Sequence, residues 1–243
     1  MTGGYPQPDK TLFIVKALEK GGADLLELGI PYSDPIADGP TIQAASQKAL
    51  AAGVTVKSIL GLVGELRRES TIPVILMTYL NPLLAYGEQA FFSDAVAAGV
   101  DGLLVSDLPV DERPHFWELA HESGLKCITL VAPTTPPARL PRILSRASGF
   151  VYCLTRTGVT GHGRGFADNL DRQVGLVRDH TDLPIVCGFG VRSAMDIRSI
   201  KADVDGVVLG ARLLEILMES EDLTDGTAKL TRFLQELSPA LGR

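Results

Sequence analysis

The chain has 243 residues, 45% of them hydrophobic, and a formal net charge of -6 at pH 7. This length and apolar content suit a large buried core and predict a single domain over residues 1–243. The negative charge offers no overall basic field for nucleic acid or an anionic membrane surface, so an anionic ligand must be held locally. No stretch approaches the roughly 18 uninterrupted apolar residues of a membrane span, and residues 1–4 lack the apolar region of a signal peptide.

Short apolar runs alternate with longer amphipathic segments along almost the whole chain, a pattern typical of parallel strands joined by crossover helices. Seven strands are predicted, at residues 23–29, 73–77, 102–106, 126–131, 150–154, 184–188 and 205–210. Helices are predicted at residues 8–22, 56–66, 89–98, 111–122, 137–147, 170–178 and 223–237. We therefore expect an α/β fold, a (β/α)8 TIM barrel.

An eighth strand is needed to close such a barrel, and the sequence offers little for it. Met1 and Thr2, just before the turn at Gly3 and Gly4, could be the stub of a first strand, but a usual strand has about five residues. We predict a barrel whose first strand is truncated or nearly absent, so that it is either open or completed by something else.

The three cysteines are far apart, and each lies in an apolar strand-like run rather than in a metal-type cluster. They are Cys127, Cys153 and Cys187. This pattern favours a reduced, cytoplasmic protein and gives no indication of a metal site.

In a parallel barrel the reactive groups lie where strands end, and Glu27 is the first candidate there. It stands between leucines in an apolar strand, which should raise its pKa toward a value useful for proton transfer. A structural carboxylate paired with a cation is an equally good interpretation. Asp34 and Asp38 follow in a Pro- and Gly-rich loop, where each alone is more typical of a turn or of a cap on a helix starting at Pro40. Either could instead form an acid/base pair with Glu27.

Two further strand ends carry candidate ligand-binding groups. The strand at 150–154 runs into a loop with four glycines between Gly158 and Gly165, which could order over a ligand or be an ordinary mobile loop in which His162 is simply exposed. Glycines after the last two strands could let backbone N–H groups approach an anion, which suggests a phosphate site; tight turns that need glycine are the alternative. These glycines are Gly188, Gly190 and Gly210.

The run from Leu26 to Gly39 resembles the signature of the tryptophan synthase alpha chain family: Glu-hydrophobic-Gly, then aromatic-Ser-Asp-Pro, then Ala-Asp-Gly. Other stretches resemble the family in the same order, so that the likeness covers nearly the whole chain: residues 77–82, residues 107–109, Arg156 with residues 158–161, and residues 188–190. The chain departs from the family in its short N-terminus, in Ala211 where serine is common, and in residues 161–165.

This resemblance implies a lyase of tryptophan biosynthesis that splits indole-3-glycerol phosphate into indole and glyceraldehyde 3-phosphate without metal or organic cofactor. Glu27 would be the principal acid/base, Asp38 would hold the indole N–H, and Tyr152 would lie beside Glu27. Thr160 would reach Asp38 when its loop closes. The remaining residues implied for binding substrate or its phosphate are Tyr79, Gly161, Gly188, Gly190, Gly210 and Ala211.

The resemblance also implies a partner, the tryptophan synthase beta chain, in an alpha2beta2 complex. The residues implied for this interface are Pro31, Asp34, Pro35, Asn81, Pro82, Asp107 and Pro109. A second hypothesis is a catalytically weak subunit that mainly binds and activates the beta chain; the presence of Glu27, Asp38 and Tyr152 favours the enzyme. A different phosphate-binding barrel is a third interpretation, which the specific run from Glu27 to Gly39 disfavours.

Overall fold

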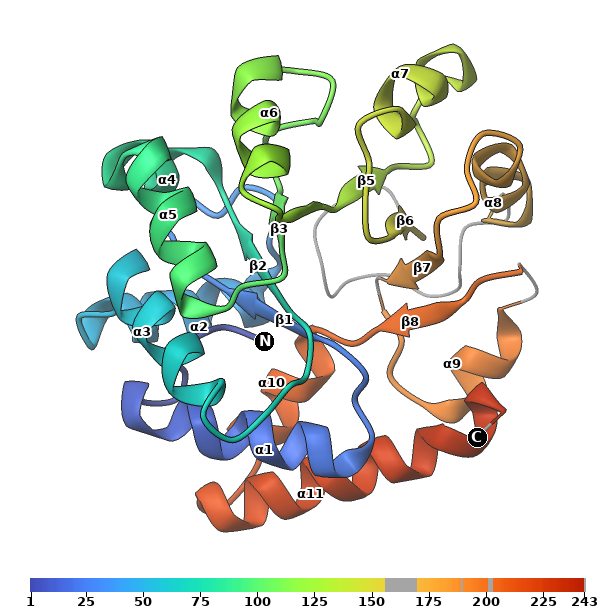
Figure 1. Ribbon diagram of the computed structural model, residues 1–243. Helices are drawn as coiled ribbons and strands as arrows, with labels where there is room; N and C mark the ends of the chain where they lie inside the picture. The colour runs from blue at the N-terminus through green and yellow to red at the C-terminus, as the bar shows by residue number, and fades with distance from the viewer. Residues whose placement is uncertain (156–169, 189, 201–202, 243) are drawn as a thin grey trace.

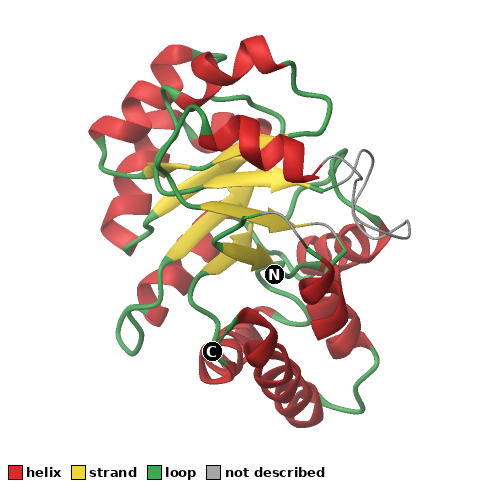
Figure 2. Ribbon diagram, turned by 90° about the vertical axis from the view of Figure 1, so that its right-hand side faces the viewer, coloured by secondary structure: helices red, strands yellow, loops and turns green. Residues whose placement is uncertain are grey.

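The computed structural model describes residues 1–155, 170–188, 190–200 and 203–242. Strands form the centre of the molecule and helices surround them (Figures 1 and 2). The strands are β1 (Leu26–Gly29), β2 (Val74–Thr78), β3 (Gly102–Val105), β4 (Lys126–Cys127), β5 (Thr129–Val131), β6 (Val151–Leu154), β7 (Ile185–Gly188) and β8 (Gly206–Val208). All their pairings are parallel, in the orders β1-β2-β3-β4 and β5-β6-β7-β8.

The seven predicted strands are therefore present, one of them in two parts. The run at 126–131 is interrupted at Ile128, where the ladder passes from β4 to β5. The first-strand position is filled only by Thr2, which forms an isolated parallel bridge with Gly29; the Gly3 N–H donates to the Gly29 carbonyl at 2.8 Å. The architecture is a (β/α)8 barrel with a stub in place of its first strand, as predicted.

The helices are α1 (Thr11–Gly21), α2 (Pro40–Ala51), α3 (Val56–Leu66), α4 (Leu80–Tyr86), α5 (Glu88–Ala98), α6 (Pro114–Glu122), α7 (Leu140–Leu144), α8 (Leu170–Arg178), α9 (Ala194–Ser199), α10 (Ala211–Met218) and α11 (Leu223–Leu237), with 3-10 turns at Pro8–Lys10, Pro137–Arg139 and Ser238–Leu241. The predictions at 56–66, 170–178 and 223–237 are confirmed to the residue. The helix predicted at 111–122 begins only at Pro114, because Arg113 before it has a left-handed φ of 45°. Helix 137–147 is shorter than predicted, and α4, α9 and α10 were not predicted.

Alternation along the strands separates two apolar layers. Residues such as Leu28, Val74 and Leu76 are fully buried against the helices. The intervening residues form an inner cluster, which includes Ile75 and Tyr152. Since successive side chains of a strand point to opposite faces, Glu27 between Leu26 and Leu28 belongs to the inner face.

Helices α1 and α11 lie side by side (Figure 1), and the Thr231 hydroxyl donates to the Ala17 carbonyl at 3.0 Å. Within the described part of the chain no single helix is long and apolar enough to cross a membrane; α2 and α3 meet the length and composition criteria only when joined, and they bend by 96° between them.

Candidate active site

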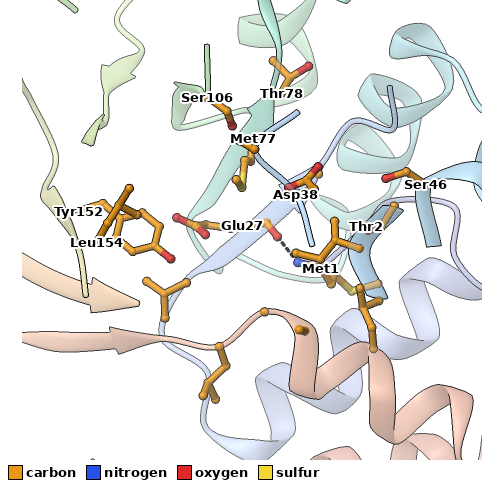
Figure 3. Close-up of a pocket in the computed structure, with 18 of the residues that line it drawn as sticks. Met1, Thr2, Glu27, Asp38, Ser46, Met77, Thr78, Ser106, Tyr152 and Leu154 are labelled. Carbon is orange, nitrogen blue, oxygen red and sulfur yellow. Dashed lines mark hydrogen bonds between the residues drawn. The ribbon is translucent and has the colours of Figure 1, made fainter. Parts of the chain in front are cut away.

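A cavity of about 450 Å³ opens at the carboxyl ends of the strands. Glu27 from β1, Asp38 from the loop after β1 and Tyr152 from β6 line it together (Figure 3). Tyr79, which follows β2, lines it too. The structure therefore brings together residues separated by up to 125 positions in sequence, counted as 152 minus 27. A parallel barrel produces this convergence because all its strands end on the same side.

Glu27 is a carboxyl group whose side chain has no ion-pair partner among the described side chains. Its Oε1 atom is buried and has no hydrogen-bond partner among the described residues, and no described cationic side chain forms an ion pair with it. Burial raises the Glu27 pKa to about 7, although the nearby positive Met1 amino group acts in the opposite direction. That amino group donates to the Glu27 backbone carbonyl at 2.5 Å. A carboxyl with such a pKa is populated in both protonation states near neutral pH.

Asp38 is buried, with a relative exposure of 6%. Burial raises its pKa, and a hydrogen bond from the Tyr79 hydroxyl partly opposes this shift. The same hydroxyl accepts the Ala37 N–H at 3.1 Å, so Tyr79 fixes the loop that carries Asp38. The prediction that Asp34 or Asp38 caps the following helix is wrong, because the N-cap of α2 is Gly39.

Tyr152 is a buried inner-face residue whose pKa is raised well above its usual value, first by burial and then by the Glu27 charge. Its ring occupies the space that a side chain at position 188 would need. A Cβ added to Gly188 would lie 2.1 Å from the Tyr152 hydroxyl. Gly188 is not among the cavity-lining residues, and the absence of a side chain there makes room for Tyr152. Its contact with substrate stays a prediction.

The other described glycines of the predicted phosphate site do line the cavity. Gly190 has a left-handed φ of 93°, and Gly210 is the N-cap of α10, whose first residue is Ala211. The first N–H groups of a helix have no acceptor within it, and α10 has no acidic side chain in its first turn. This end of the cavity therefore presents backbone donors and a partial positive charge. Thr160 and Gly161 lie outside the described residues.

The residues predicted for a partner interface lie outside the cavity. Asp34, Asn81, Asp107 and Pro109 are exposed, and Pro35 and Pro82 are half-buried. Pro31 differs from the others because it is buried within the chain, so its side chain packs inward.

Two of these exposed groups connect loops at the same end of the barrel. The Asp107 carboxylate accepts the Leu80 N–H at 2.8 Å, and the Asn81 amide donates to the Tyr32 hydroxyl at 2.9 Å. The Tyr32 ring lies 5.3 Å from the Tyr79 ring, centroid to centroid. The exposed loops and the cavity wall are thus in direct contact.

Sequence reasoning missed several residues that line the cavity. Ser106 follows β3, and its Oγ atom is buried with no hydrogen-bond partner among the described residues, which leaves it available to a ligand. Its place at a predicted strand end was a signal that could have identified it. Thr78, Arg192 and Arg212 also line the cavity. No group of three or more His, Cys, Asp or Glu side chains that could hold a metal ion occurs in the described ranges.

Comparison with known proteins identifies one family. The family model described as "Tryptophan synthase alpha chain" matches residues 1–241. The tryptophan synthase alpha chain of Laribacter hongkongensis is 47% identical over 88% of this chain and 82% of its own. A solved Mycobacterium tuberculosis tryptophan synthase aligns with a TM-score of 0.89 at 37% identity, over 99% of this chain and 90% of that one. The tryptophan synthase a2b2 complex of Pyrococcus furiosus gives 0.86 at 36% identity, over 98% and 95%.

Proposed function

Because the chain belongs to the tryptophan synthase alpha chain family, we propose that Glu27, Asp38 and Tyr152 form its catalytic site for cleaving indole-3-glycerol phosphate. The reaction is a carbon–carbon lyase step that yields indole and glyceraldehyde 3-phosphate in tryptophan biosynthesis. One observation carries the assignment of residues: two carboxyl groups with raised pKa values, from separate elements, line the same cavity.

The chemistry requires a base, a charge-stabilising group and protonation of the ring. The Glu27 carboxylate accepts the proton of the glycerol hydroxyl next to the indole and later returns it to solvent, while a proton from water is delivered to the ring carbon that bears the glycerol chain. The bond between these two carbons then breaks, its electron pair returns to the indole ring, and the hydroxyl carbon becomes the aldehyde. The Asp38 carboxylate accepts the indole N–H and stabilises the positive charge that develops on the ring.

Tyr152 and Tyr79 orient the two carboxyl groups. Burial and the neighbouring Glu27 charge both raise the Tyr152 pKa, so its hydroxyl stays protonated and remains a hydrogen-bond donor. Tyr79 donates to Asp38 and favours its ionised form. At the other end of the cavity, Gly190, Gly210 and Ala211 would offer backbone N–H groups to the phosphate, and Thr160 and Gly161 remain proposals from the sequence.

The test is the ultraviolet assay of indole release, run on the parent chain and on Glu27→Gln. We expect the variant to lose about 10² to 10⁴-fold in rate, the usual contribution of one acid/base group. Glu122→Gln is the matched control, because Glu122 is an exposed glutamate of α6 outside the cavity. Parent-like activity of Glu27→Gln would refute the assignment. Activity of neither protein alone, together with stimulation of a beta chain by the parent, would favour the activating-subunit hypothesis.

Solved relatives of this chain include tryptophan synthase complexes. We propose that the chain associates with a beta chain in an alpha2beta2 arrangement, through Asp34, Asp107 and Pro109 of the exposed loops and Asn81 at the start of α4. These loops lie at the same end of the barrel as the cavity, so an associated chain would sit close to the site where indole is released. Gel filtration of the mixed chains measures this assembly.

A further inference from the structure

Two arginines line the cavity that holds the catalytic carboxyl groups. Arg192 follows Gly190 after β7, and Arg212 is the second residue of α10. They are the only cationic side chains among the described residues that line this cavity, and Glu27 and Asp38 are the only acidic ones. The arginines belong to the Gly190 and Gly210 end, whereas the carboxyl groups come from β1 and the loop after it. The cavity therefore has an acidic part and a cationic part.

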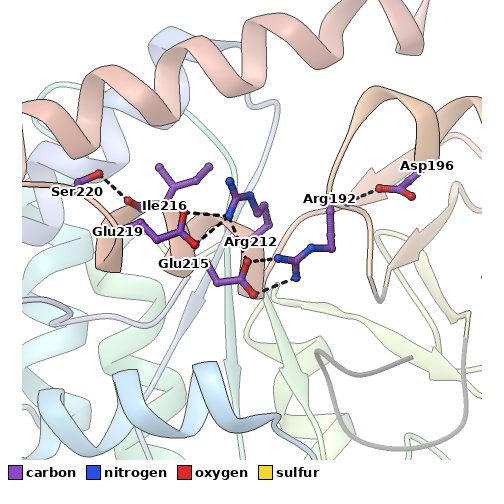
Figure 4. A network of polar contacts seen from close by, with 7 residues as sticks. All are labelled: Arg192, Asp196, Arg212, Glu215, Ile216, Glu219 and Ser220. Carbon is purple, nitrogen blue, oxygen red and sulfur yellow. Dashed lines mark hydrogen bonds and ion pairs between the residues drawn. The ribbon is translucent and has the colours of Figure 1, made fainter. Parts of the chain in front are cut away.

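A glutamate holds the two guanidinium groups together (Figure 4). Arg192 Nη1 donates to Glu215 Oε1 at 2.9 Å, and Arg192 Nη2 donates to Glu215 Oε2, which makes the contact bidentate. Arg212 Nη1 donates to the same Oε2 atom at 3.3 Å and also to Glu219. The Arg192 backbone N–H donates to the Asp196 carboxylate at 2.9 Å, and this bond fixes the backbone at Arg192.

The arrangement leaves donors available to a ligand. A guanidinium has five N–H donors. Arg212 makes its contacts with described residues through Nη1 alone, which leaves its Nε and Nη2 donors available. The side chains of Arg192 and Arg212 are 48% and 27% exposed, whereas that of Glu215 is 19% exposed. Glu215 thus supports the pair from the more buried side, and neither Glu215 nor Glu219 lines the cavity.

We propose that Arg192 and Arg212 bind the phosphate group of the substrate, an inference that rests on the proposed function. The backbone N–H groups at the start of α10 supply hydrogen bonds but no full charge, and Ala211 has no hydroxyl to add. A phosphomonoester carries close to two negative charges at neutral pH, and arginine pairs with phosphate through charge-assisted bonds. The two guanidinium groups are partly offset by Glu215 and Glu219, but they add charge-assisted donors that the backbone lacks, and these select phosphorylated ligands over unphosphorylated ones.

The test compares Arg192→Gln, Arg212→Gln and the double variant with the parent chain. Arg198→Gln is the matched control, because Arg198 is an exposed arginine of α9 that does not line the cavity. Steady-state indole release gives KM and kcat, and calorimetry with inorganic phosphate gives an affinity independent of catalysis. Indole serves as the unphosphorylated inhibitor.

We expect each single variant to raise KM and to weaken phosphate binding by about tenfold, with larger effects in the double variant and kcat changed by less than about threefold. Inhibition by indole should not change, arginine-to-lysine variants should recover part of the affinity, and added salt should reduce the difference from the parent.

A purely structural network would give another result: a lower melting temperature with parent-like KM and phosphate affinity, which would overturn the inference. The two proposals fail separately. If the parent cleaves the substrate and the double variant binds phosphate as the parent does, only the inference fails. If phosphate binding depends on both arginines but no protein releases indole, the arginine site stands and the proposed reaction fails.

Discussion

Gly188→Ala tests how the barrel wall holds Tyr152 in place. The new Cβ would lie 2.1 Å from the Tyr152 hydroxyl and 2.6 Å from its Cε2 atom, closer than non-bonded atoms can approach. The ring must therefore move, and because Tyr152 is buried it can move only toward the cavity or into the inner cluster. Overpacking of this kind typically costs about 1–3 kcal/mol of unfolding free energy, and a displacement of about 1 Å at a catalytic site can lower a rate about 10²-fold.

Chemical denaturation and the indole-release assay measure the two effects of Gly188→Ala. Gly64→Ala is the matched control, because a Cβ at Gly64 in α3 meets nothing within 4 Å. Since alanine favours helix over glycine by roughly 0.5–1 kcal/mol, this control should be as stable as the parent or more so. Adding Tyr152→Phe to Gly188→Ala should recover part of the lost stability, because it removes the closest contact. Parent-like stability and rate in Gly188→Ala would refute the reasoning.

Four other predictions concern Glu27, Asp38, Tyr79 and Asn81. Folding raises the Glu27 pKa from 4.5 to about 7, so the folded state loses stability as the pH rises through this window. Above about pH 8, the unfolding free energy of Glu27→Gln should therefore exceed that of the parent by roughly 3 kcal/mol, and below about pH 4 the difference should vanish in denaturation curves. Asp38→Asn should lower kcat by about 10²-fold in the indole assay, and an unchanged kcat would contradict the role of Asp38. Tyr79→Phe should raise the Asp38 pKa further, because it removes the hydrogen bond that lowers this pKa. Asn81→Ala, which loses the bond to Tyr32, should weaken binding of a beta chain by about tenfold in calorimetry, and unaltered affinity would exclude Asn81 from the interface.

The strands and longer helices were predictable from the sequence because their apolar spacing is regular over many residues. Helices α9 and α10 were missed because they are six and eight residues long and follow glycines that suggested loops. The break at Ile128 was also missed, since the apolar run at 126–131 continues through it. The apolar pattern of a sequence predicts the face of the sheet on which each residue lies, but it does not predict whether the strand's hydrogen-bonded pairing with its neighbour is continuous.

In the candidate site, too, some residues could be identified from the sequence and others could not. Glu27 was identifiable because a lone carboxylate in an apolar strand is unusual, and its residue type and position alone pointed to a raised pKa. The packing role of Gly188 was not identifiable from the sequence, because it depends on the Tyr152 ring, which lies on a neighbouring strand 36 positions earlier (188 minus 152). Arg192 and Arg212 were passed over for a similar reason: only the fold places both on one cavity with Glu215 behind them.

The pH dependence of kcat/KM for indole release tests most directly the claim that Glu27 is the acid/base group. Because its carboxylate must accept the hydroxyl proton, we predict that kcat/KM of the parent falls with decreasing pH below a break near 7, the value to which burial raises the Glu27 pKa. The residual activity of Glu27→Gln should lack this break. A parent profile that is flat between about pH 5 and pH 9, or a break that persists in Glu27→Gln, would contradict the account.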